Sequence, residues 1–147
     1  MPNERYVYIL LSEEKWWNRL CGRNRNSSQM HAFVRRSRVG PLRAQKLLFY
    51  VNKPVMQIRG VADFIERLVG DYKELWDAHG DETCFKTFDE YVVFLRGRTT
   101  ATFIRFTNFR ELTDPVSMEI ISEVLGVLRM PAMGKYLNRE TANQLII

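Results

Sequence analysis

The sequence of 147 residues predicts a single α+β domain, residues 1–147, built around a compact, curved mixed sheet or small β-barrel flanked by short helices. The chain length and a hydrophobic content of 46% are those of an ordinary globular domain with a sizeable core. The expected strands are too many for a helical bundle, and short helices interrupt them irregularly. Gly60 lies inside one expected strand, which indicates a bulge or a close backbone approach at a bend.

The expected strands are short runs in which apolar and polar residues alternate, or in which β-branched and aromatic residues gather. Asn52, Lys53 and Pro54 are expected to form the turn between the third and fourth of them. In chain order the strands are expected at residues 5–11 (RYVYILL), 30–35 (MHAFVR), 46–52 (KLLFYVN), 55–67 (VMQIRGVADFIER) and 100–106 (TATFIRF).

Polar caps, prolines and glycines bound the expected helices. Ser12 is expected to cap a first helix that ends at Gly22. A later helix is expected to start at Asp114-Pro115, with Gly126 beyond its end. Asn138 is expected to cap the last one.

An acidic insertion at about 70–97 is expected to contain two further helices. The first, DYKELWDAH, is expected to stop at Gly80. The second covers FDEYVVFLR, and Thr87 and Glu90 have the spacing of a capping box at its start.

The charge distribution indicates an anionic partner. The 48 residues from Lys15 to Ala62 contain no Asp or Glu but carry eight Arg and three Lys, whereas residues 63–100 carry nine acids. Concentrated positive charge favours nucleic acid over an anionic small molecule, a membrane surface or a merely solvated face. The excess of arginine favours planar, bidentate contacts to phosphates and bases.

Several stretches, taken in order, resemble the PUA-like superfamily and, within it, EVE-type domains. They are SEEKWW after the first strand, SRVGPLRAQKLLFYV, VMQIRGVADF, TFIRFTNFRELTDPV and RMPAMGKYLNRETANQLI. The chain departs from the EVE pattern in having Gly40-Pro41 where a Gly-Asp turn is common, and in its longer acidic insertion. These departures leave open a separate branch of the superfamily.

The resemblance implies a small barrel with a pocket for a nucleobase. EVE domains and their YTH relatives are associated with modified bases, and PUA domains with RNA. We therefore expect the chain to bind RNA or DNA and to recognise a flipped or modified base. The expected base or pocket contacts are Ser12, Trp16, Trp17, His31, Phe33, Tyr50, Met130 and Gly134, and the expected contacts to the nucleic-acid backbone are Arg23, Arg25, Arg35, Arg36, Arg38, Arg129 and Lys135.

The two adjacent tryptophans are expected to have different roles, because neighbours on a helix point about 100° apart. If Ser12 is the cap, Leu11 and Trp16 occupy the hydrophobic-staple positions, so that Trp16 has a structural role. Trp17 then points sideways and is the freer ligand contact. Both remain candidates for lining a pocket.

The related ASCH domains include amidohydrolases that act on an acylated cytidine with a lysine, a threonine and a glutamate. Lys86, Thr87 and Glu90 supply these residue types, but the capping box already accounts for Thr87 and Glu90. An enzyme on a modified nucleoside is thus the alternative function, and a protein-interaction domain that uses the acidic insertion is a third. We expect no metal site or cofactor, because no ligand spacing occurs. Two cysteines and the lack of a long apolar run favour a cytoplasmic protein without a membrane partner.

Overall fold

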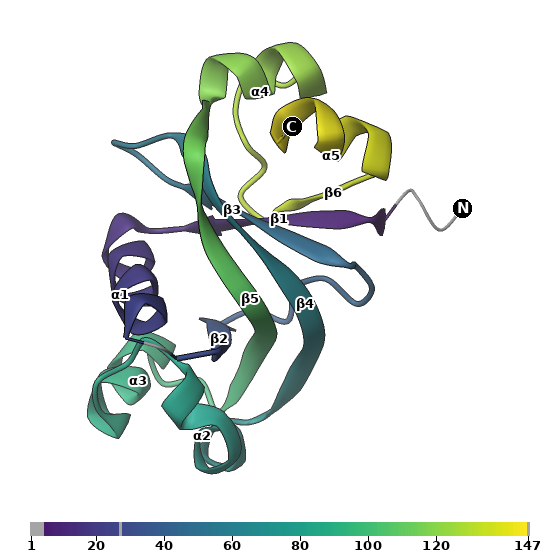
Figure 1. Ribbon diagram of the computed structural model, residues 1–147. Helices are drawn as coiled ribbons and strands as arrows, with labels where there is room; N and C mark the ends of the chain where they lie inside the picture. The colour runs from purple at the N-terminus through teal and green to yellow at the C-terminus, as the bar shows by residue number, and fades with distance from the viewer. Residues whose placement is uncertain (1–4, 27, 147) are drawn as a thin grey trace.

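The computed structural model describes residues 5–26 and 28–146, and its main feature is a strongly bent six-stranded sheet (Figure 1). The strand order is β2-β5-β4-β3-β1-β6. β1 and β3 pair in parallel, and the other neighbours are antiparallel. The strands are β1 (Val7–Ser12), β2 (Met30–Arg35), β3 (Lys46–Val51), β4 (Gln57–Asp71), β5 (Thr100–Ser117) and β6 (Lys135–Leu137).

The sheet is mixed, as expected, but it is not closed into a barrel. Within the described residues the two edge strands, β2 and β6, pair with β5 and β1 and not with each other. β6 has only three residues, and the chain after β2, through Gly40 and Pro41, forms no strand that could extend the ladder toward it. A side chain makes the link instead: the backbone N–H of Leu42 donates to the Tyr136 hydroxyl at 2.9 Å.

Gly60 marks a bend in β4, as predicted. The pairing of β4 with β5 is irregular between Ile58 and Gly60, and the pairing with β3 shifts at the same level. The Trp17 ring lies on this glycine so closely that a Cβ at residue 60 would be 2.6 Å from a Trp17 ring carbon. The bend therefore coincides with the place where the first helix packs on the sheet.

That first helix, α1 (Glu14–Arg25), differs from the prediction at both ends. Ser12 does not cap it, because Ser12 is still paired with Val51 in the sheet and its hydroxyl donates to the Glu13 carbonyl at 3.0 Å. The helix also continues past Gly22, whose backbone does not adopt the left-handed conformation that ends a helix.

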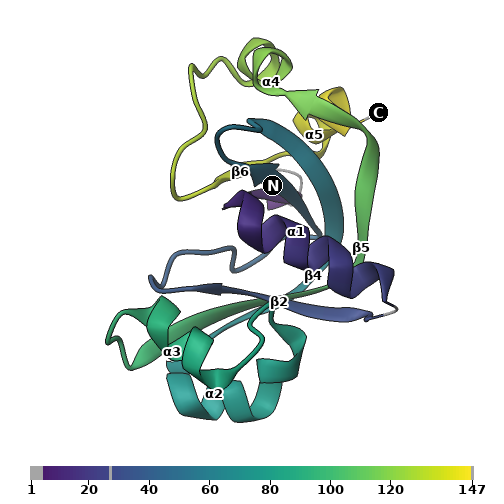
Figure 2. The ribbon, with the colours of Figure 1, turned by 90° about the vertical axis from the view of Figure 1, so that its left-hand side faces the viewer.

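The acidic insertion forms α2 (Tyr72–His79), a short 3₁₀ turn (Gly80–Glu82) and α3 (Phe88–Leu95), which confirms the two helices. The Thr87 hydroxyl accepts from the backbone N–H of Glu90 at 3.1 Å, as a capping box requires. The Glu90 carboxylate accepts from the N–H of Lys86 rather than that of Thr87. Both helices pack on the lower end of β4 and β5 (Figure 2), where Tyr91 and Phe103 are fully buried.

The prediction that Asp114-Pro115 starts a helix is wrong, because β5 continues to Ser117. Proline is tolerated there, since the residues between Glu111 and Val116 have no ladder partner in β4. The helix that follows is α4 (Met118–Leu125), and the Ser117 hydroxyl caps it. Its end at Gly126 and the capping of α5 (Arg139–Ile146) by Asn138 are as predicted.

We predict that Gly60→Ala lowers the free energy of unfolding by about 2 kcal/mol, because the new methyl group overlaps the Trp17 ring. Gly70→Ala in the same strand is the control, since a Cβ at residue 70 meets nothing within 4 Å. Urea denaturation monitored by tryptophan fluorescence measures both. Equal stability of the two variants would contradict the proposed packing.

Candidate functional site

A cleft of about 790 Å³ lies between the start of α1, β2, the end of β3, α3 and the loop that follows α4. Figure 2 shows this loop, residues 126–134, extending from α4 and returning to β6. Segments from both ends of the chain and from the acidic insertion thus meet around one hollow.

One side of the cleft is an aromatic wall made of Trp16, Phe85 and Phe94. The ring of Trp16 meets Phe85 edge-on with centroids 4.9 Å apart and Phe94 edge-on at 5.8 Å. Phe85 and Phe94 in turn pack against each other at 5.1 Å. Such edge-to-face contacts hold three rings in one rigid surface.

Arg19 ties this wall to the insertion. Its guanidinium lies over the Trp16 ring at 5.0 Å, and it donates to the Glu90 carboxylate at 2.6 Å and to the Cys84 carbonyl at 3.2 Å. The hydrogen bond from Arg19 and that from the backbone N–H of Lys86 lower the pKa of Glu90 to about 2. Glu90 is therefore an ionised anchor for Arg19.

The cleft is rich in cations. Within the described residues its lining holds a single carboxylate, that of Glu13, against five basic side chains. None of the five forms an ion pair in the part of the chain that the structure describes. Their charge is thus available to an anionic ligand. The five are Arg35, Arg36, Lys53, Arg98 and Arg129.

The floor of the cleft is buried and mostly apolar. Tyr50 and Met130 lie there, with exposed fractions of 4% and 7%, and Ser12 lies beside them. The Tyr50 hydroxyl donates to the sulfur of Met118 at 3.5 Å, and burial raises its pKa. A floor of this kind suits a flat ring better than a hydrated ion.

Eight of the residues that the sequence analysis selected therefore share this cleft. The aromatic and apolar members come from three strands or helices and from one loop, and the cations come from the end of β2, from the residue after it and from that same loop. They are Ser12, Trp16, Phe33, Tyr50, Met130, Arg35, Arg36 and Arg129.

The expected roles of the two tryptophans are reversed. Trp17 has 4% of its surface exposed and packs against Phe109 and Phe49, with ring centroids 5.4 and 6.2 Å away. Trp16 lines the cleft instead. The prediction failed because it assigned the cap to Ser12, whereas Trp17 is fixed by the space above Gly60.

His31 is also a core residue rather than a contact in the cleft. It is 1% exposed, its ring stacks on Phe106 at 5.4 Å, and its Nε2 lies 3.2 Å from the Asn24 side-chain oxygen. Burial, and secondly the charge of Arg23, lower the pKa of His31 to about 4. The imidazole is therefore neutral at physiological pH.

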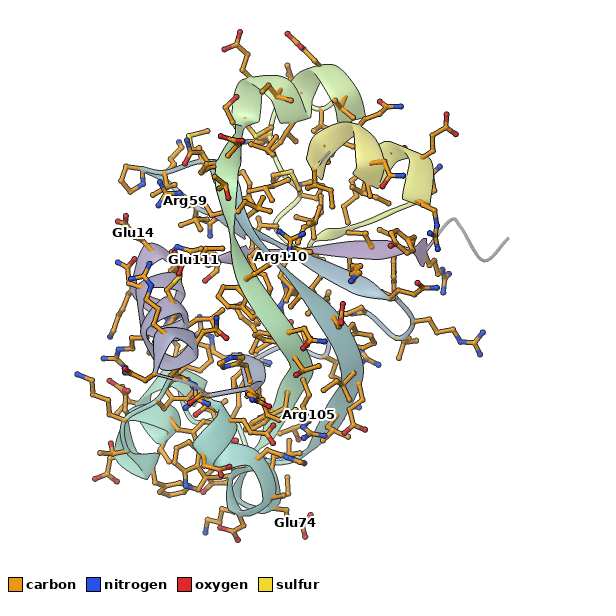
Figure 3. All side chains as sticks on the ribbon, viewed as in Figure 1. Glu14, Arg59, Glu74, Arg105, Arg110 and Glu111 are labelled. Atoms are coloured by element: carbon orange, nitrogen blue, oxygen red, sulfur yellow. The ribbon has the colours of Figure 1, made fainter. Side chains whose placement is uncertain are left out.

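The remaining selected residues lie outside the cleft. Gly134 does allow a close approach, with φ +88°, but to the Ile9 carbonyl rather than to a ligand. Arg23 donates to the Met30 carbonyl. Arg25 pairs at 2.7 Å with Glu111, which is labelled beside α1 in Figure 3. Arg38 is exposed, and Lys135 lines a separate small hollow near α5.

Several residues that line the cleft were not predicted from the sequence. Phe85 and Phe94 belong to the acidic insertion, which was set apart from the basic segment, and Arg98 follows it. Lys53 and Asn52 were assigned only to a turn. The many aromatic residues inside the otherwise acidic insertion were the sequence feature that could have indicated its part in the cleft.

The fold is similar to that of a solved ASCH protein. The chain superimposes on the ASCH protein of Zymomonas mobilis with a TM-score of 0.78 at 18% identity, covering 95% of this chain and 93% of the other. Two variants of that protein give the same result: a serine-to-alanine variant (TM-score 0.77, 19% identity, 97% and 95% covered) and a tyrosine-to-phenylalanine variant (0.77, 18%, 95% and 96%).

The PUA-like resemblance seen in the sequence is thus confirmed at the level of the fold, while the closer likeness to EVE domains stays a prediction. No family model matches the chain, and no curated protein does so either. In the described part of the chain no helix has the length and apolar character to cross a membrane, and no three acidic, histidine or cysteine side chains are grouped to hold a metal ion.

We predict that Glu90→Gln lowers the free energy of unfolding by about 1 kcal/mol at pH 6. The carboxylate has a lower pKa in the folded state than its ordinary 4.5, so its contribution is complete above pH 4.5 and is lost as the pH falls toward about 2. Denaturation curves at pH 6, 4 and 2.5 should therefore converge for the two proteins. Glu123→Gln, an exposed carboxylate on α4, is the control, and a difference that stays constant with pH would contradict the Arg19–Glu90 assignment.

Proposed function

We propose that the chain binds nucleic acid, RNA or DNA, as a single strand with one base in the cleft. The base is one that is flipped out of its stack or chemically modified. The observation that carries the proposal is that an aromatic wall and five cations, none of them ion-paired within residues 5–26 and 28–146, share one cleft of about 790 Å³. A flipped base needs a flat apolar surface, and its phosphates need cations, so these are the two components that such a ligand requires.

The phosphates on either side of the base would contact the cations of the cleft. Arg129 on the loop and Lys53 in the turn after β3 both line it, and neither forms an ion pair with another described residue. Arg38 is exposed on the segment that follows β2 and extends the positive surface. Of the other predicted backbone contacts, Arg23, Arg25 and Lys135 lie outside the cleft and would meet only a longer strand.

The fold supports the binding of nucleic acid, but it does not distinguish RNA from DNA or binding from hydrolysis. PUA-like proteins, as a group, are associated with RNA and modified bases, and the solved ASCH proteins share the fold of this chain. Whether the strand is RNA or DNA is for the binding experiment to decide.

Hydrolysis of a modified nucleoside is the alternative function, because the solved neighbours are ASCH proteins. The residues that supply the ASCH types are otherwise engaged, since Glu90 binds Arg19 and the Thr87 hydroxyl caps α3. Lys86 is exposed and does not line the cleft. Binding without turnover is therefore the function we favour.

We propose further that the chain forms one domain and acts in the cytoplasm. The structure adds that Cys21 and Cys84 are free thiols. Burial raises the pKa values of Cys21 and Cys84 to about 12 and about 11, so neither is a reactive thiolate at neutral pH. The predicted ends of the domain, at residues 1 and 147, lie outside the described residues.

We predict that Arg129→Ala weakens binding of a fluorescein-labelled 10-nucleotide single strand by about 10-fold and lowers the salt slope by about 0.7. The control is Arg110→Ala, an exposed arginine on β5 outside the cleft lining (Figure 3), which should bind like the wild type. Fluorescence anisotropy with RNA and with DNA, at 50 to 200 mM salt, measures both quantities. Absence of binding by the wild type at 50 mM salt, or equal loss in both variants, would overturn the proposal.

Incubation with N4-acetylcytidine, followed by mass spectrometry, tests the alternative function. We expect the nucleoside to remain intact. Release of acetate at a rate that depends on the protein concentration would establish the enzyme instead.

A further inference from the structure

The geometry points to Arg36 as the surface on which the bound base stacks, with its guanidinium sandwiched between the base and Phe94. This inference deepens the proposed function and rests on it. It assigns base recognition to an arginine rather than to a tryptophan.

Cations already cover three of the aromatic rings that line the cleft, those of Trp16, Phe33 and Phe94. Two cations lie over Trp16: Lys15 Nζ is 4.7 Å and the Arg19 guanidinium 5.0 Å from the ring centroid. Arg35 lies 6.0 Å from the centre of Phe33. A base that stacked on either ring would have to compete with these side chains.

Arg36 covers Phe94 in the same manner and is held in place by hydrogen bonds. Its guanidinium carbon lies 4.5 Å from the centre of the Phe94 ring, and its Nη1 donates to the Phe94 carbonyl at 2.8 Å. Arg98 donates to the backbone carbonyl of Arg36 at 3.4 Å. Two hydrogen bonds therefore hold Arg36 in place. One is made by its guanidinium and the other by its backbone carbonyl.

A guanidinium is planar and stacks on aromatic rings through either face. Arg36 lines the cleft, and its guanidinium carbon lies over the Phe94 ring. We infer that the side of the guanidinium directed away from Phe94 is the surface on which a ligand stacks. One of its donors is committed to the Phe94 carbonyl, so Arg36 is less suited than Arg129 to grip phosphate. The arrangement favours a flat unsaturated ring over a bare phosphate.

Arg36→Lys separates stacking from charge, because lysine keeps the positive charge but has no planar group. The probe is a fluorescein-labelled 5-nucleotide single strand of whichever nucleic acid binds the wild type better, together with the same strand lacking its central base. We expect Arg36→Lys to weaken binding of the intact strand about 10-fold, with the salt slope unchanged, and to leave binding of the abasic strand unchanged.

Arg36→Ala is the second variant, and it should weaken binding of both strands because the charge is lost as well. Arg110→Lys, outside the cleft, is the control for the arginine-to-lysine change. Thermal denaturation verifies that each variant is folded.

The outcomes distinguish this inference from the proposed function. If the wild type binds neither strand, both fail. If the wild type binds the intact strand better than the abasic strand, and Arg36→Lys keeps that preference, only the assignment of Arg36 is wrong. An equal loss for the two strands would make Arg36 a phosphate contact and would also overturn the inference.

Discussion

The contact between Trp17 and Gly60 determines how the first helix lies on the sheet, and the rest of the cleft depends on it. The indole ring occupies the space that a side chain at residue 60 would fill, at the level where β4 bends. Because adjacent residues on a helix point about 100° apart, a buried Trp17 directs Trp16 away from the sheet core. Trp16 then faces Phe85 and Phe94 of the insertion, which places an aromatic surface at the edge of the sheet.

The second requirement is that the acidic insertion reaches back to the basic segment. The ion pair between Arg19 and Glu90 joins the two at a distance of 2.6 Å, and both partners are partly shielded from water. Between β1 and the loop before β6, the Tyr8 hydroxyl donates to the Met133 carbonyl, and Gly134 lies against the Ile9 carbonyl. These contacts hold the loop that carries Arg129 and Met130 beside the first strand.

Much of the fold could be predicted from local sequence patterns. Alternation located five of the six strands, and Thr87, Asn138 and Gly126 marked the ends of helices through backbone chemistry that operates over a few residues. The prediction of a helix at Pro115 was wrong. A proline before an apolar run is typical of a helix start, but here Pro115 lies in β5, at a place where that strand has no ladder partner. The open sheet could not be foreseen, because it depends on the length of β6 and on the path of the loop between β2 and β3.

The positive charge of the candidate site could be predicted from the sequence, whereas the positions of its aromatic side chains could not. The arginines after β2 were identified from a segment without acids, and three of the cleft cations come from that segment. The exchange of roles between Trp16 and Trp17 depends on the space above Gly60, which a pattern of residue types does not contain. The same holds for His31, because only the structure shows Phe106 and Phe109 around its ring.

The most direct test of the account is to follow the three indole N–H signals in ¹H–¹⁵N spectra while an unlabelled single strand is added. Trp16 lines the cleft, Trp17 lies in the core, and Trp76 packs on Tyr91 in the insertion. If a base enters the cleft, the signal of Trp16, assigned by a Trp16→Phe variant, shifts in a saturable manner while those of Trp17 and Trp76 keep their positions. A shift of Trp17 or Trp76 with Trp16 unchanged would contradict it.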